Sequence, residues 1–304
     1  MTATPFSSQG FQADLVRHKL IIPGGVKGVF GRGAVFEDVV QRFDALVSRL
    51  TEGDGAERMF FPPLIDRRVF EKSGYLDSFP QLAGAVFSFD GTDADHEELR
   101  ARVRDGKPWS DLLVMTSVVL PPAACYSVYP TCTGTVPENG RLVDTHNWVF
   151  RHEPSPEPTR LQAFRMREVV RVGTADLVVE WRNRWLERGL ELLRSLELPA
   201  RAQTASDAFF GRGGRILAQS QRQQELKFEL VIPVISEDQP TAVCSFNYHQ
   251  SHFGEIFDIF TPGGQVAHSA CLGFGMERIA MALFKTHGFV PAEWPQPVRE
   301  RLWR

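Results

Sequence analysis

Short connections between successive strand candidates constrain the fold of this chain more than any other feature of its sequence. One pair of candidates, Leu142–His152 and Gln162–Val172, is joined by a loop that contains three prolines. A second pair, Lys227–Ile235 and Thr241–Tyr248, is separated by a few residues. Parallel strands need a crossover of a dozen or more residues, so we expect both pairs to be antiparallel. Strands joined in this way, with helices between and after them, predict an α+β fold.

Helices are predicted around these strands from the spacing of the apolar residues. The segment Val35–Leu50 has one broad apolar face, Asp93–Arg104 is polar, and Leu177–Leu196 is long and amphipathic. A strand over His268–Leu272 leads into a helix over Met276–Phe284. Three further strand candidates are Arg58–Phe61, Ala85–Phe89 and Leu112–Leu120. We expect one domain over residues 34–304 and a loosely attached extension over residues 1–33.

Composition excludes several classes of protein. The chain has 34 Lys and Arg residues against 37 Asp and Glu residues, which gives a net charge of −3 and no basic nucleic-acid footprint. It contains no stretch of 18 consecutive apolar residues and begins without the basic and apolar regions of a signal peptide, so we expect a cytoplasmic protein without a membrane span. The four cysteines are too few for a disulfide framework and are interpreted as thiols or metal ligands.

Arg151 and Glu153 lie two residues apart at the end of a strand candidate, so they are expected to share a face. An arginine there can bind a phosphate, and the glutamate can accept a hydrogen bond from an amine. An exposed ion pair would use the same two residues, and both interpretations stay open at this point.

Glu168 lies on the strand candidate Gln162–Val172, where alternation places it on one face with Phe164 and Met166 and opposite Arg165 and Arg167. A carboxylate on an apolar face is costly unless a cation or a hydrogen-bonding partner compensates it. Glu168 is therefore either half of a structural ion pair or a ligand.

Two further segments could contribute to a site. In Cys271–Arg278 a strand passes through two glycines into a helix whose first turn contains Arg278, where a phosphate could meet helix N–H groups and a guanidinium together. The same glycines would also suit a plain packing turn. Cys125 follows a strand and a proline pair, where a cysteine is either a buried small hydrophobe or a metal ligand.

Taken in order, these segments resemble the catalytic core of the class II aminoacyl-tRNA synthetases, in which helices flank an antiparallel sheet. The segment Val35–Leu50, the strand Arg58–Phe61 and Pro62 resemble motif 1, which forms dimers; Phe150–Glu153, a loop and Phe164 resemble motif 2; and Gly273–Arg278 resembles motif 3.

A closer resemblance, over roughly residues 34–290, is to the amino acid:[carrier protein] ligases, which are truncated relatives of the zinc-dependent, atypical seryl-tRNA synthetases. It is carried by Ser73–Leu76, Pro122–Tyr126 and Phe164–Glu168, while Lys227–Leu230 and Thr241–Ser245 look like the last sheet strands of seryl enzymes. The resemblance implies a zinc ion held by Cys125, Glu168 and Cys271, which binds the amino group of the substrate. Cys132 is the rival first ligand.

The resemblance also implies an ATP site. Arg151 would hold the α-phosphate, Arg278 the γ-phosphate, and Glu153 the adenine or amino group side. The other implied contacts are Arg160 and Leu161 over the adenine, Lys227, and Ala242, Val243, Cys244 and Ser245 along the nucleotide. Seryl enzymes have a magnesium-supporting glutamate near position 242, where this chain has Ala242 and Val243, so Glu229, Asn247 and His249 are possible substitutes for Mg²⁺.

The implied reaction is ATP-dependent activation of a small amino acid, glycine first and alanine second, with serine still open. A homodimeric enzyme would then transfer the aminoacyl group of the adenylate to the phosphopantetheine thiol of a holo-carrier protein, with release of AMP. A tRNA acceptor is disfavoured because we find no coiled-coil arm, appended domain or net positive charge. Candidate docking residues for an acidic carrier are Arg215, Arg222 and Lys227, or Arg182, Arg184 and Arg188. The alternatives are a free-standing, seryl-like tRNA aminoacylator and a non-catalytic amino-acid-sensing paralogue.

Overall fold

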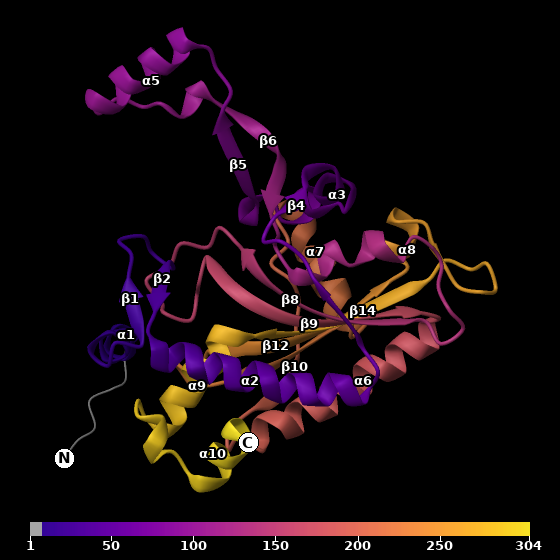
Figure 1. The fold of residues 1–304 in the computed structure, drawn as a ribbon. Helices are drawn as coiled ribbons and strands as arrows, with labels where there is room; N and C mark the ends of the chain where they lie inside the picture. Colours follow the sequence, from indigo (N-terminus) through magenta and orange to yellow (C-terminus); the bar gives the residue numbers. More distant parts are fainter. Residues whose placement is uncertain (1–7) are drawn as a thin grey trace.

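A seven-stranded sheet forms the centre of the computed structural model, which describes residues 8–304 (Figure 1). Its strands, in spatial order, are β10 (Arg201–Thr204), β11 (Lys227–Ile232), β12 (Thr241–Gln250), β14 (His268–Gly275), β9 (Ala163–Gly173), β8 (Arg141–Phe150) and β3 (Glu57–Phe60). Neighbouring strands pair antiparallel except β3 and β8, which are parallel. The predicted α+β class and its antiparallel sheet are therefore confirmed, with one parallel edge strand.

Two apolar cores lie on opposite faces of this sheet because side chains alternate along each strand. Val169 of β9 and Leu272 of β14 belong to the larger core, whereas Met166 and Cys271 belong to the smaller one. The larger core is covered by α2 (Ala34–Gly53), α6 (Ala175–Arg194) and α9 (Met276–His287). The smaller core is covered by the 3₁₀ turns η3 (Ala124–Ser127) and η4 (Tyr129–Cys132) and by α8 (His252–Ile256).

The apolar face of α2 packs inside its own chain. Phe36 stacks on Phe284 of α9 with ring centroids 5.7 Å apart, and Phe43 meets Phe274 of β14 edge-on at 5.8 Å. The amphipathic pattern predicted the helix correctly, but α9 and β14 of the same chain bury its apolar stripe. The stripe therefore gives no support to the expected homodimer, which stays a prediction.

A smaller three-stranded sheet and a helix extend away from the central sheet (Figure 1). Its strands, in spatial order, are β4 (Ile65–Asp66), β6 (Leu113–Leu120) and β5 (Gly84–Phe89), and its helix is α5 (Asp93–Arg104). The helix begins with a capping box, in which Thr92 and Asp95 bond each other's backbone N–H groups. The remaining short elements between β3 and β8 are α3 (Arg67–Lys72), α4 (Tyr75–Ser78), η1 (Pro80–Leu82), η2 (Ser110–Leu112) and β7 (Gly134–Thr135).

The N-terminal segment is not loosely attached where the structure describes it. It forms α1 (Ser8–Arg17), β1 (Ile21–Pro23) and β2 (Phe30–Arg32). Phe11 and Leu15 are fully buried in the larger core, because the amphipathic α1 covers part of it. Residues 1–7 of the expected extension lie outside the described residues, and the division at residue 34 stays a prediction.

Some strand ends and short elements differ from expectation. β8 ends at Phe150 instead of His152, and β11 at Ile232 instead of Ile235. The pattern missed β10, which is exposed along its whole length, as well as α7 (Gly211–Gln223), whose first turn is rich in glycine. The elements near the C-terminus are β13 (Ile259–Phe260), η5 (Pro291–Glu293) and α10 (Gln296–Trp303). Among residues 8–304, no helix has the length and apolar character needed to cross a membrane.

Candidate functional site

Cys125, Glu168 and Cys271 meet on the face of the sheet that η3 covers. Glu168 and Cys271 lie on the adjacent strands β9 and β14, and Cys125 lies on η3, which follows β6 and a proline pair. The two sulfurs and a carboxylate oxygen all lie within 4.8 Å of one another, and all three residues are buried. The backbone N–H of Cys125 donates to Glu168 Oε2 at 2.7 Å. Glu168 thus lies on the face that alternation predicted for it.

The cluster concentrates negative charge in a buried place. Burial, followed by the charge of the Cys271 sulfur, raises the pKa of Glu168 to about 7. The Cys271 thiol has its pKa lowered, mainly because the Cys125 thiol hydrogen-bonds to its sulfur. A cation bound among these three groups would relieve the cost of burying a carboxylate beside a thiolate.

The donor set fits a zinc ion. Sulfur and oxygen ligands bound to tetrahedral zinc lie about 3.5 Å apart, so the observed cluster would need only a small closure. Three protein ligands leave one coordination position for a substrate, as catalytic zinc sites do. Cys132 is not part of the cluster: its sulfur lies 3.6 Å from Arg141 Nη1 and 3.7 Å from the carbonyl of Val128.

Polar side chains of β12 face Cys271. Asn247 Nδ2 donates to Cys271 Sγ at 3.4 Å, and His249 Nε2 lies 3.6 Å from the same sulfur. His249 Nδ1 lies 3.1 Å from Ser269 Oγ and 3.4 Å from the hydroxyl of Tyr129. Asn247 and His249, which the sequence suggested for Mg²⁺, are therefore engaged at the cysteine cluster, and Tyr129 had not been singled out from the sequence.

Arg151, Arg160 and Arg278 converge beside this cluster. Arg278 donates from Nε to the carbonyl of Thr159 and from Nη1 to that of Ala242, each at 2.9 Å. Burial lowers the pKa of Arg278, and the charges of Arg151 and Arg160 lower it further. Arg160 Nη1 lies 3.6 Å from Glu153 Oε1. Because nearby carboxylates do not neutralise all the positive charge of these three guanidiniums, the group favours an anionic ligand with several charges.

Met166 connects the arginines with the cysteine cluster. Arg151 Nε donates to the carbonyl of Pro122 at 2.9 Å, and its Nη2 lies 3.7 Å from Met166 Sδ. A Cβ atom at Gly273 would lie 3.0 Å from Met166 Cε and 3.5 Å from Glu168 Cγ. The glycine therefore allows β14 to pack closely here, and the arginine group and the cysteine cluster are neighbours.

The other predicted nucleotide residues are placed differently. Leu161, Val243 and Cys244 are buried in the larger core, while Ala242 offers the carbonyl that binds Arg278. Ser245 Oγ lies 3.5 Å from Asn247 Nδ2. Whether these residues contact ATP stays a prediction.

Lys227 is paired with acidic residues. Its ammonium ion-pairs with Asp207 and lies 3.4 Å from Glu229 Oε1. Asp207 lies in the loop before α7, and no motif in the sequence pointed to it. Since Glu229 is already paired with Lys227, the position of Mg²⁺ also stays a prediction.

Similar proteins were found by sequence. Amino acid–[acyl-carrier-protein] ligase 1 of Bradyrhizobium diazoefficiens is 45% identical over 291 residues, which cover 95% of this chain and 89% of the ligase. Ligase 2 of the same organism is 44% identical and covers 99% of this chain and 89% of its own length. Type-2 serine–tRNA ligase of Methanopyrus kandleri is 29% identical over 92% of this chain and 58% of that enzyme. No protein-family model matches the chain.

Solved structures support the fold. The M. kandleri SerRS, solved in complex with A. aeolicus tRNASec, superposes with a TM-score of 0.80 at 21% identity, over 99% of this chain and 62% of that one. Prolyl-tRNA synthetase of Cryptosporidium parvum, solved with halofuginone and AMPPNP, gives a TM-score of 0.68 at 12% identity, over 92% of this chain and 52% of that one. At these identities the likeness shows the class II synthetase fold alone.

Proposed function

Because the chain belongs to the family of the amino acid–[acyl-carrier-protein] ligases, we propose that it activates a small amino acid with ATP and transfers it to the phosphopantetheine thiol of a carrier protein. The observation that carries this proposal is that two groups of side chains lie side by side. The Cys125–Glu168–Cys271 cluster suits an amine held by a metal, and the arginines beside it suit a polyphosphate.

The proposed reaction has two steps. The amino acid carboxylate attacks the α-phosphorus of ATP and displaces pyrophosphate, and the carrier thiol then attacks the adenylate carbonyl and releases AMP. Arg151, next to Met166 and Glu168, would hold the α-phosphate, and Arg278 would hold the γ-phosphate while negative charge grows on the leaving group. The chain thus works mainly by positioning the reactants and stabilising charge, with Mg²⁺ accompanying ATP.

A zinc ion, when bound, would supply a Lewis acid that takes up the neutral α-amino group of the substrate. Cys125, Glu168 and Cys271 would hold it, and the donors Asn247 and His249 would stabilise the thiolate of Cys271.

Aromatic side chains beside Cys271 support a small substrate. Tyr129 stacks on Phe253 with ring centroids 3.9 Å apart, and His249 meets Phe253 edge-on at 5.0 Å. We propose glycine first and alanine second; serine would be rejected poorly, because a hydroxyl adds little volume.

Helix α7 suits the carrier protein better than helix α6. On α6, Arg182 is buried and donates to the carbonyl of Glu225, and Arg188 pairs with Asp54 at 2.6 Å. On α7, by contrast, Ile216 is 72% exposed and Leu217 is 50% exposed. Arg215 and Arg222 lie on the same helix, so α7 offers both apolar and basic side chains to an acidic carrier.

We also propose a homodimer through the motif 1 region. Phe60, at the end of the edge strand β3, is 71% exposed, and Leu64 is 38% exposed. Sedimentation at micromolar concentration should give twice the chain mass of 34.2 kDa, and a species of that single mass alone would contradict this part of the proposal.

ATP–pyrophosphate exchange with each of the twenty amino acids tests the activation step. Exchange that is strongest with glycine or alanine would support the proposal. A preference for a large or charged amino acid would contradict the proposed substrate, and no exchange with any amino acid would indicate a non-catalytic paralogue.

A further inference from the structure

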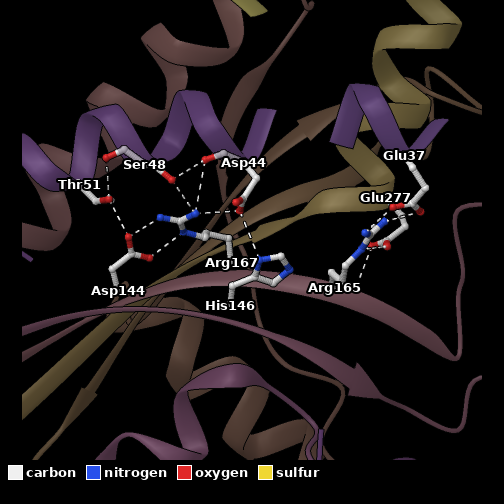
Figure 2. A network of polar contacts seen from close by, with 9 residues as sticks. All are labelled: Glu37, Asp44, Ser48, Thr51, Asp144, His146, Arg165, Arg167 and Glu277. Atoms are coloured by element: carbon white, nitrogen blue, oxygen red, sulfur yellow. Dashed lines mark hydrogen bonds and ion pairs between the residues drawn. The ribbon is translucent and has the colours of Figure 1, made fainter. Parts of the chain in front are cut away.

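Arg165 joins helix α2 to the first turn of helix α9 through two carboxylates (Figure 2). Its Nη1 and Nη2 donate to the two carboxylate oxygens of Glu37 at 2.7 and 2.9 Å. Its Nε donates to Glu277 Oε1 at 2.8 Å, and its backbone N–H donates to Glu277 Oε2 at 2.8 Å. The side chain of Glu277 is 1% exposed, so this is a buried and fully engaged carboxylate.

Glu277 is also held from a third side. Arg32 Nε, on β2, lies 3.3 Å from Glu277 Oε1, and its guanidinium packs over the ring of Trp148 at 4.8 Å. Arg165 packs over the same ring at 5.1 Å. Two cations and the two carboxylates Glu37 and Glu277 balance in charge, so loss of one partner would leave an unpaired charge at a buried position.

The next residue after Glu277 is Arg278, which we place on the γ-phosphate. Successive residues of a helix point about 100° apart, so Glu277 points toward Arg165 while Arg278 points toward Thr159 and Ala242. Fixing the Glu277 carboxylate therefore fixes the backbone from which Arg278 extends, without any contact to the ligand.

We propose that Glu37, Arg165 and Glu277 are positioning residues for Arg278 and hence for the phosphates of ATP. This inference rests on the proposed function, because the phosphate role of Arg278 is part of it. It predicts that changes as distant as Glu37 on α2 weaken ATP use selectively.

A second arginine on the same strand provides a matched control. Arg167 ion-pairs with Asp144 on β8, and its Nη1 donates to Asp44 Oδ1 on α2 at 2.8 Å (Figure 2). This network joins the same helix to the same sheet through Asp144, Thr51 and His146, and none of these contacts within residues 8–304 reaches α9. Asp44→Asn therefore removes a comparable charge from α2 without touching the support of Arg278.

The experiment compares full-length Glu277→Gln, Glu37→Gln and Asp44→Asn with the wild type in pyrophosphate exchange, with thermal unfolding measured in parallel. We expect KM for ATP to rise about tenfold in Glu277→Gln and about threefold in Glu37→Gln. KM for the amino acid should stay within about twofold of the wild type in both, because the cysteine cluster is untouched. Asp44→Asn should leave both KM values within about twofold, even where it lowers the unfolding temperature.

Equal KM values for ATP in the wild type and in folded Glu37→Gln and Glu277→Gln would overturn the inference, as would an equal rise in Asp44→Asn. If Glu277→Gln does not fold, the KM for ATP of Glu37→Gln alone tests the inference. If the wild type shows no exchange at all, the proposed function fails, and calorimetric titration with ATP then tests the positioning role separately. Weaker ATP binding by Glu37→Gln than by Asp44→Asn would support that role. Equal ATP binding by the two variants would overturn it.

Discussion

Replacing Arg278 by methionine should separate catalysis from folding. In the folded chain this guanidinium makes two hydrogen bonds, to the carbonyls of Thr159 and Ala242, whose loss costs about 1 kcal/mol each. Burial and the charges of Arg151 and Arg160 oppose its positive charge and lower its pKa, so removing the charge returns part of that cost. The free energy of unfolding should therefore fall by less than about 2 kcal/mol.

Activity should fall far more. A contact to phosphate charge that grows in the transition state is worth about 3 kcal/mol, or on the order of a hundredfold in rate. The assay is kcat/KM for ATP in pyrophosphate exchange, together with urea unfolding of the same preparations. Arg171→Met is the matched control, since Arg171, on strand β9, likewise donates to a carbonyl, that of Asn139, at 2.6 Å. Exchange within threefold of the wild type in Arg278→Met, or an equal loss in Arg171→Met, would contradict the proposed role of Arg278 on the phosphates of ATP.

Two further predictions concern the metal and the acid stability. Cys125→Ser should lose most of the bound zinc, measured by elemental analysis as about one ion per wild-type chain, whereas Cys132→Ser should retain it; the reverse result would show that Cys132 is the ligand. Burial, the largest single influence on the pKa of Asp207, would raise it, but the charge of Lys227 and the hydrogen bonds from Gln221 and Lys227 together hold that pKa below its usual value. The stabilising contribution of these contacts is therefore present above about pH 4 and is lost as the pH falls further. Asp207→Asn should therefore unfold about 1–2 kcal/mol more easily at pH 7 and lose less stability than the wild type between pH 5 and pH 3; urea unfolding with identical pH profiles would contradict this.

Periodic patterns predicted the long elements well because burial enforces them. Alternation on β9 placed Glu168 opposite Arg165 and Arg167, and the structure confirms this, with the two arginines facing α2. The pattern of α2 predicted a helix with an apolar face, but a pattern does not say what covers that face. Here α9 of the same chain covers it, so the apolar stripe gave a wrong reason for expecting a dimer.

Residues brought together from distant parts of the chain were harder to predict. Spacing could not decide between Cys125 and Cys132, because both follow the same strand and the decision lies in how η3 turns toward β9. Asp207 could not be predicted because it lies in a loop that has no sequence motif. The neighbouring helix α7 was not predicted either, because its glycines have low helix propensity. These positions depend on tertiary packing, for which local sequence carries little information.

The acceptor of the activated amino acid distinguishes the proposed carrier-protein ligase from a tRNA aminoacylator. Wild-type protein, ATP and glycine would be incubated with holo-carrier protein, with apo-carrier protein and with tRNA, and each acceptor would be examined by mass spectrometry. We expect a mass gain of one glycyl group on the holo-carrier alone, because only its phosphopantetheine thiol can form the thioester. Glycyl transfer to tRNA at a comparable rate, or to the apo-carrier, would contradict it.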